Sequence, residues 1–272
     1  MSEPGALRLF VKTIIGRAYP RVVGSLRNLS WLILEIGLPL LGTIAMIYVY
    51  QALGAPRSYL GFVILGGALL AFWQNVVWLM AVQFMWDRGG GNLELYAMAP
   101  TSLTAILLGM AVGGILMTVG RAATVVLVGS LLFGVTYQGA GLLPAAGILL
   151  LTLCALYCLG MMLASLFLFY SREAWNIGNA LQEPIWLLSG FYFPVRSLGA
   201  FVGGAGSLIP LTLGLDAMRQ LLLPGTPVFL PVGVEAAALV VQLIAYAALS
   251  QVALAFMEKR ARTDGKLIMR WG

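Results

Sequence analysis

The chain consists of long apolar stretches separated by short polar segments. Six stretches are close to the ~20 residues that a helix needs to cross about 30 Å of hydrocarbon. They cover residues 29–50, 59–85, 102–135, 142–170, 175–193 and 231–257. The pattern predicts an all-α integral membrane protein with six transmembrane helices.

The third stretch, 102–135, is longer than one upright crossing requires. As a helix with a rise of about 1.5 Å per residue it would extend over roughly 50 Å, which is too long for one upright span and too short for two spans with a turn. We expect one tilted helix that bends at Gly113, Gly114 or Gly120.

The segment ahead of the first span is basic and amphipathic. Apolar residues recur on one helical face, and basic residues lie largely elsewhere. The apolar residues are Leu7, Phe10, Val11, Ile14, Ile15, Ala18 and Val22, and the basic ones are Arg8, Lys12, Arg17 and Arg21. This predicts an interfacial helix, kinked at Pro20, on an anionic inner leaflet; a solvated basic tail is the alternative. Because the first uninterrupted apolar run begins near Leu29, we expect no cleaved signal peptide.

The segment 194–230, between the fifth and sixth spans, stays apolar although it lies outside them. It is rich in leucine and glycine and is interrupted by Pro194, Pro210, Pro224 and Pro227. Backbone at membrane depth must satisfy its own hydrogen bonds or be buried in protein. We therefore expect two short helices that form a re-entrant hairpin in the outer leaflet. Two full-length helices are the alternative, but each half is short for a crossing.

The distribution of charge predicts the orientation. The chain has 61% hydrophobic and only 10% charged residues, with a formal net charge of +6. Twelve Lys and Arg residues lie in one set of alternate loops and tails, and three lie in the other. Because basic residues are retained on the cytoplasmic side, we expect a multi-pass protein of the cytoplasmic membrane with both termini in the cytoplasm. Its regions are an interfacial helix (1–28), a transmembrane domain (29–257) and a basic tail (258–272).

Several function classes lack the residues that they require. The chain has no His, and Cys154 and Cys158 lie within one apolar run, so no metal site is expected. It has no Gly-x-Ser-x-Gly elbow and no phosphate-binding Gly-Lys-Ser/Thr loop. We therefore expect neither a catalytic site nor ATP hydrolysis by that route in this chain. Its basic residues flank apolar spans, which argues against nucleic acid as a partner.

Three charged residues fall within the spans, where a charge usually faces a cavity or a partner. Counted from the cytoplasmic side, Glu35 and Glu183 lie roughly 9 to 12 Å deep, whereas Arg121 lies roughly 28 Å along its helix. We therefore expect Arg121 and Glu35 to extend towards opposite surfaces without pairing; a proton relay is the alternative. Glu183 precedes Pro184 and suggests a helix break that lines a pathway. Further candidates for an apolar pathway, or for core and lipid-facing positions, are Trp73, Trp78 and Trp186.

The loop 86–100 is the most specific polar segment. It begins with Asp87 and Arg88, continues through three glycines and ends at Pro100. Asn92 is placed to cap a short helix with Glu94 in its first turn, where the helix dipole favours a carboxylate. Such a helix, lying across the ends of two spans, would offer a surface to a partner. A plain connector is the alternative.

The order of these elements resembles the permeases of type-2 ABC exporters, which include drug, lipid and polysaccharide exporters. The similarity covers nearly the whole chain. It rests on the Gly-x-Leu-Glu segment that ends at Pro100 and is followed by Leu108-Gly109, on Glu183-Pro184 to Ser189-Gly190 followed by Phe193-Pro194, and on Ile209-Pro210-Leu211-Thr212 with Asp216 and Arg219.

The resemblance implies a permease that forms a homodimer or heterodimer and binds two copies of a separate cytosolic ATPase. ATP and Mg²⁺ would bind to that ATPase, and this chain would bind no cofactor. The cargo would be apolar or amphiphilic (a drug, lipid or glycan-lipid), exported by alternating access. The residues implied in coupling to the ATPase are Asp87, Arg88, Asn92, Glu94, Tyr96, Pro100, Arg172 and Glu173. Those implied in a re-entrant gate are Gly203, Pro210, Asp216 and Arg219.

Two other function classes compete with this hypothesis. An ion-coupled secondary transporter or a channel would act without an ATPase, but a secondary transporter should have paired acidic groups at mid-membrane and an internal repeat. A membrane-embedded enzyme acting on lipid would need His or clustered carboxylates. The residues favour the exporter permease.

Overall fold

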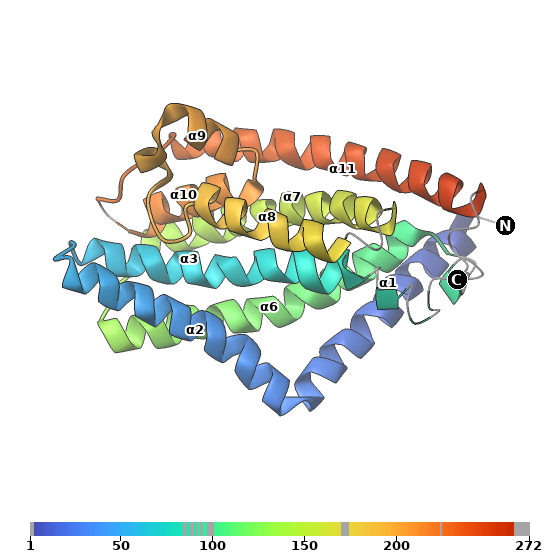
Figure 1. Cartoon of the computed structure of the whole chain (residues 1–272), viewed down its shortest axis with the longest axis horizontal. Helices are drawn as coiled ribbons and strands as arrows, with labels where there is room; N and C mark the ends of the chain where they lie inside the picture. Colours follow the sequence, from blue (N-terminus) through green and yellow to red (C-terminus); the bar gives the residue numbers. More distant parts are fainter. Residues whose placement is uncertain are drawn as a thin grey trace.

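The chain forms a bundle of helices that run along one common axis (Figure 1). In this computed structural model, residues 3–83, 86, 87, 90, 92, 95, 96, 101–169, 174–223 and 225–263 are described, and these residues contain no strand. The α-helices are α1 (Glu3–Arg27), α2 (Leu29–Ala52), α3 (Ser58–Gln74), α6 (Leu103–Phe133), α7 (Leu142–Phe169), α8 (Ala174–Leu188), α9 (Gly199–Gly206), α10 (Pro210–Leu222) and α11 (Val232–Thr263). A π-helix, η1 (Asn75–Ala81), continues α3, and the 3-10 turns η2 (Gly139–Gly141) and η3 (Val195–Leu198) precede α7 and α9.

Five of the described helical segments are long and apolar enough to cross a membrane. They are Leu29–Ala52, Ser58–Ala81, Leu103–Phe133, Gly139–Phe167 and Val232–Phe256, and they fall on five of the six predicted spans. The remaining span, 175–193, contains α8, which has only 15 residues and extends over about 22 Å. A sixth crossing therefore stays a prediction. The last helix, α11, continues past the predicted end at residue 257 as far as Thr263.

The long helix α6 is continuous from Leu103 to Phe133, and its glycines admit neighbouring helices. A Cβ atom at Gly109 would lie 2.8 Å from the carbonyl oxygen of Ile14, and one at Gly113 would lie 3.1 Å from Cα of Ala18. Small residues four apart allow two helix backbones to approach closely. The first half of α6 therefore packs directly on α1.

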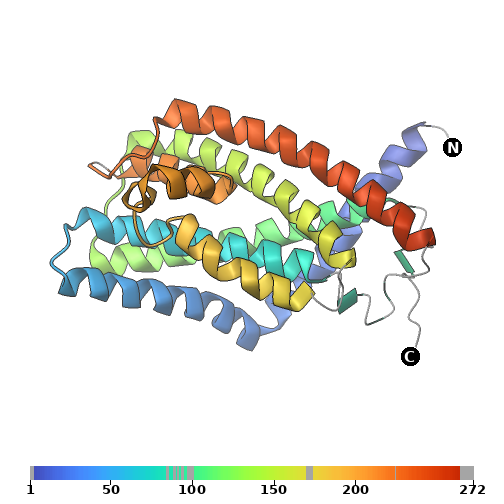
Figure 2. The same ribbon diagram turned by 45° about the horizontal axis from the view of Figure 1, so that its top comes forward.

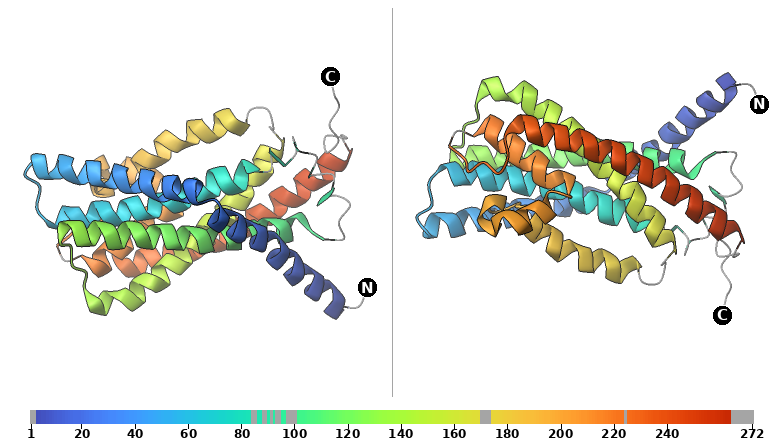
Figure 3. Two further views of the ribbon diagram at one scale, coloured as in Figure 1. Left: turned by 90° about the horizontal axis from the view of Figure 1, so that it is seen from below. Right: turned by 90° about the horizontal axis from the view of Figure 1, so that it is seen from above.

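The N-terminal helix α1 continues through Pro20 and diverges from the bundle axis (Figure 3). It meets α2 at Asn28, whose side chain accepts a hydrogen bond from the backbone nitrogen of Trp31 and caps α2. Leu7, Val11 and Ile15 form an exposed apolar stripe on α1. The predicted helix is present, and its location at a membrane interface stays a prediction.

The two short helices predicted within 194–230 are observed as α9 and α10, and the alternative of two full-length helices is wrong. They lie at the end of the bundle opposite the start of α1 and the end of α11 (Figure 2). Arg219 of α10 is 1% exposed and donates hydrogen bonds to the carbonyl oxygens of Phe62, Gly190 and Phe191, over 2.9, 2.8 and 2.7 Å. These bonds attach α10 to α3 and to the turn after α8. Insertion of α9 and α10 into the outer leaflet stays a prediction.

The centre of the bundle is α3 with η1, because 94% of the residues in their apolar window are buried. Neighbours reach the α3 backbone at glycines. A Cβ atom at Gly66 would lie 1.6 Å from the carbonyl oxygen of Phe191 and 2.8 Å from Nη2 of Arg219. The Arg219 bonds therefore depend on a residue without a side chain at position 66.

Gly66→Ala is expected to lower the thermal unfolding temperature in detergent by several degrees, because overpacking against backbone costs about 1–3 kcal/mol. Gly120→Ala is the matched control, since a Cβ atom there meets no atom within 4 Å. Equal unfolding temperatures for the two variants would contradict the close contact at Gly66.

Candidate coupling and transport site

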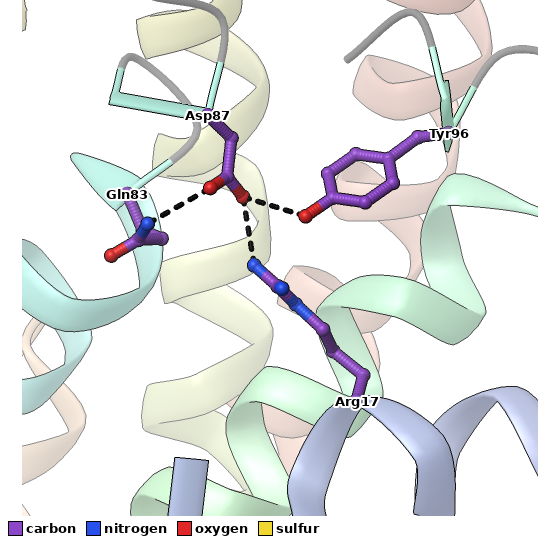
Figure 4. Close-up of polar contacts among 4 residues, drawn as sticks. All are labelled: Arg17, Gln83, Asp87 and Tyr96. Carbon is purple, nitrogen blue, oxygen red and sulfur yellow. Dashed lines mark hydrogen bonds and ion pairs between the residues drawn. The ribbon is translucent and has the colours of Figure 1, made fainter. Parts of the chain in front are cut away.

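Asp87 is the centre of a polar cluster at the end of the second apolar span. Its side chain is 5% exposed and forms an ion pair of 2.7 Å with Nη2 of Arg17. Its carboxylate also accepts hydrogen bonds from Nε2 of Gln83 over 2.9 Å and from the hydroxyl of Tyr96 over 2.9 Å. Figure 4 shows these three donors converging on the carboxylate. We call these four residues the Asp87 cluster.

The Asp87 cluster joins three segments that are far apart in the sequence. Arg17 comes from α1, Gln83 and Asp87 from the end of the second span, and Tyr96 from the loop. The guanidinium of Arg17 also lies over the ring of Tyr96, 5.3 Å from its centroid. Burial raises the pKa of Tyr96 to about 12, so its hydroxyl stays protonated and donates at neutral pH. Tyr96 therefore connects the loop to α1 through Asp87 and Arg17.

Two of the residues predicted to couple to an ATPase, Asp87 and Tyr96, are thus in contact. Asn92 is exposed and, like Tyr96, has helical backbone. The other predicted residues lie outside the described part of the chain: Arg88, Glu94, Pro100, Arg172 and Glu173. Sequence reasoning missed Gln83, although it lies one turn before Asp87. It also missed Arg17, for which no local pattern could indicate a partner 70 residues away.

The prediction that Glu35 and Arg121 do not pair is wrong. Nη1 of Arg121 lies 2.8 Å from Oε2 of Glu35, and their side chains are only 8% and 13% exposed. Nη2 of Arg121 also donates to Oγ1 of Thr118 over 3.0 Å. The error came from assuming that α2 and α6 begin at the same level. Arg121 lies 18 residues into α6 and Glu35 six into α2, so α6 must begin roughly 18 Å earlier along the axis. Its additional turns pack on α1.

Two adjoining cavities lie beside this ion pair. We define the apolar cavity, of about 360 Å³, by its lining residues Trp31, Leu34, Glu35, Leu38, Pro39, Gln74, Asn75, Trp78, Leu79, Trp86, Arg121 and Trp175. The polar cavity, of about 350 Å³, is lined by Arg17, Pro20, Arg21, Gly24, Ser25, Trp31, Glu35, Leu79 and Gln83. The two cavities share the lining residues Trp31, Glu35 and Leu79, so they adjoin each other between the Asp87 cluster and Arg121.

Of the predicted pathway residues, Glu35 and Trp78 line the apolar cavity. Nε1 of Trp78 donates to Oε1 of Gln182 over 2.8 Å, and its ring packs on Trp175 with the centroids 4.8 Å apart. Trp73 is 1% exposed, and Trp186 packs partly buried against the same core. Neither lines either cavity, which agrees with the core alternative for these two tryptophans.

Glu183 lies outside the two cavities, and the predicted helix break beside it is wrong. Its side chain is exposed, and α8 continues through Pro184 to Leu188. Pro184 therefore removes one backbone hydrogen bond of α8 without ending the helix.

The predicted gate residues are buried at the opposite end of the bundle. Pro210 is the first residue of α10, and a Cβ atom at Gly203 would lie 2.8 Å from the ring of Phe229. Asp216 does not pair with Arg219. Its carboxylate accepts from Nε2 of Gln220 over 2.9 Å and from the backbone nitrogen of Phe229 over 3.0 Å. These contacts form a packed cap, and its opening stays a prediction.

The long apolar helices and the polar groups enclosed between them are typical of a multi-pass membrane protein. The sequence profile of the ABC-2 type transporter family matches residues 22–223. The chain belongs to this family, which confirms the resemblance drawn from its sequence, and it is a transmembrane component of an ABC transporter, not itself catalytic. A comparison with curated proteins finds no match.

Removing one partner of the Glu35–Arg121 pair should destabilise the protein more than removing both. Arg121→Met leaves the largely buried Glu35 carboxylate without its counter-ion, which costs on the order of 3–5 kcal/mol. The double variant Glu35→Leu with Arg121→Met removes both charges and should recover much of that loss. Thermal unfolding of the single and double variants in detergent provides the comparison. Additive losses would show that the pair is not coupled.

Proposed function

We propose that the chain is the permease subunit of an ATP-driven exporter in the cytoplasmic membrane. It works as a dimer with two copies of a separate cytosolic ATPase and moves an apolar or amphiphilic cargo by alternating access. The observation that carries this proposal is the Asp87 cluster, which connects the loop to α1 through partly buried, charge-assisted contacts. Such hydrogen bonds are shorter and stronger than neutral ones.

The contacts supply a route from the loop to the cavities. An ATPase that moves the loop would act on Arg17 through Asp87 and Tyr96. Arg17 belongs to α1, which meets α2 at the Asn28 cap. Glu35 lies two turns further along α2 and lines both cavities. Movement at the cytoplasmic end can therefore change the cavity walls without crossing the core.

The surface of α2 supports association within the membrane. Only 11% of its apolar window is buried, and Leu34, Leu38 and Leu41 are 53%, 64% and 63% exposed. An apolar surface of this kind is covered by lipid or by another chain. A second permease copy on this face would enclose the apolar cavity, which α2 lines.

Asp87→Asn and Arg17→Gln should each lower cargo-stimulated ATP hydrolysis by about fivefold or more, the range expected when a coupling of 1–3 kcal/mol is lost. Hydrolysis is measured in membranes that contain the chain together with a candidate partner ATPase. Arg8→Gln is the matched control, because Arg8 lies exposed on the same helix outside the Asp87 cluster. Full stimulation in both cluster variants would refute the coupling role, and transport that persists without any ATPase would refute the exporter proposal itself.

Glu94→Ala and Pro100→Ala, in the loop that carries Tyr96, should also lower cargo-stimulated hydrolysis. Membrane insertion should be unchanged, because both positions lie outside the apolar spans. Insertion is followed by the amount of protein in the membrane fraction. Normal stimulation in both variants would argue against contact between this part of the loop and the ATPase.

A further inference from the structure

The polar cavity contains a cation, Arg21, that forms no ion pair with any described residue. Three arginines lie along the two cavities. Arg17 pairs with Asp87 and Arg121 pairs with Glu35, whereas Arg21 makes no hydrogen bond or ion pair with any residue that the structure describes. The pKa of Arg21 is lowered to about 10, mainly by burial; Tyr157 and Glu35 raise it, whereas the charges of Arg17 and Arg121 add to the lowering. Arg21 is still charged at neutral pH, so it is a partly buried cation without a counter-ion.

Other groups around Arg21 suit an anion. Ser25 and Gln83 also line the polar cavity, and each can donate a hydrogen bond to an oxygen. The carboxylates nearby are already engaged, since Asp87 has its three donors and Glu35 has Arg121. A guanidinium with such donors beside it is a common arrangement for binding a phosphate group.

The adjoining apolar cavity suits a hydrocarbon chain. Four tryptophans line it, together with leucines and a proline: Trp31, Trp78, Trp86, Trp175, Leu34, Leu38, Leu79 and Pro39. The charged residues in its described lining, Glu35 and Arg121, form an ion pair with each other. Each cavity has a volume typical of small-molecule sites, which are roughly 300–1,000 Å³.

We infer that the two adjoining cavities together bind one anionic amphiphile from the inner leaflet, with its phosphate-like headgroup at Arg21 and its chain among the four tryptophans. This inference rests on the proposed export function in one respect, because it names the class of cargo. Two other ligands fit the cavities less well. A cationic amphiphile would place its charge beside the cations Arg17 and Arg21, and a soluble anion would leave the apolar cavity without an occupant.

The four tryptophans provide the test. The full-length chain is placed in phosphatidylcholine nanodiscs, and quenching of its tryptophan fluorescence is titrated with bromoalkyl amphiphiles of one chain length. Their headgroups are phosphate, uncharged maltoside and cationic trimethylammonium. The phosphate amphiphile should bind about tenfold more tightly than the other two, because hydrogen bonds to a charged group favour it.

Arg21→Gln should remove this preference for phosphate and leave maltoside binding unchanged. Arg27→Gln is the matched control, because Arg27 is exposed on the same helix and lines neither cavity. If Arg21→Gln loses all binding, Arg21→Lys must restore the phosphate preference for the inference to stand. Equal affinity for the three headgroups, or a preference that survives in Arg21→Gln, would overturn it.

Inorganic phosphate distinguishes the amphiphile from a soluble anion. It should displace the bromoalkyl phosphate only at far higher concentrations than an unlabelled alkyl phosphate does. Displacement at similar concentrations would mean a soluble-anion site and would overturn the inference. The titration needs no ATPase, so its failure leaves the coupling results at Asp87 standing. Conversely, a phosphate preference without any ATPase stimulation would refute the export function alone.

Discussion

A charged side chain within a bilayer is costly unless it is paired, and the pairing of Arg121 with Glu35 fixes the relative heights of the helices that meet there. Pairing Arg121 with Glu35 places the second turn of α2 beside the middle of α6. The first half of α6 therefore extends past the start of α2 along the bundle axis. This half packs against α1 at Gly109 and Gly113. The angle between α1 and α2 at Asn28 and the cavities between them both depend on this offset.

The two ends of the bundle hold their polar groups in different ways. At the end opposite the loop, Arg219 donates to three backbone carbonyls that belong to two other segments, which ties α10 firmly into the core. At the loop end, the contacts of Asp87 are made by side chains from three separate segments. Side-chain contacts can be exchanged more easily than contacts to packed backbone, so movement is expected at the loop end.

Apolar length and helical spacing were sufficient to predict most elements of the fold. Five predicted spans, the N-terminal helix and the two short helices after α8 are all present, because burial in lipid depends on local sequence alone. The π-helix η1 was not predicted. It contains Asn75, whose Oδ1 accepts from the hydroxyl of Tyr157 in α7 over 3.0 Å, and this partner lies 82 residues away.

The candidate site was predicted less completely, because pairing depends on how far one helix is shifted against another. Residue counts gave the depth of Arg121 along its own helix, but not the level at which that helix begins. Asp87 and Tyr96 were identified within one loop, whereas Arg17 and Arg21 required the contact between α1 and α6. The sequence feature that could have indicated this contact is the pair Gly109 and Gly113, because glycines four residues apart are typical of close helix packing. From the sequence alone, Gly113 was interpreted only as a possible point of bending in its helix.

The unequal burial of α2 and α3 determines where the amino-acid sequence can change during evolution. Almost every residue in the apolar window of α3 and η1 is buried. In the apolar window of α2, only 11% of the residues are buried. A substitution in α3 must fit neighbours on all sides, but most substitutions in α2 meet only lipid or a second chain. Related proteins should therefore differ far more along α2 than along α3. The protein can adapt its outer wall to new lipids or partners while its interior is conserved.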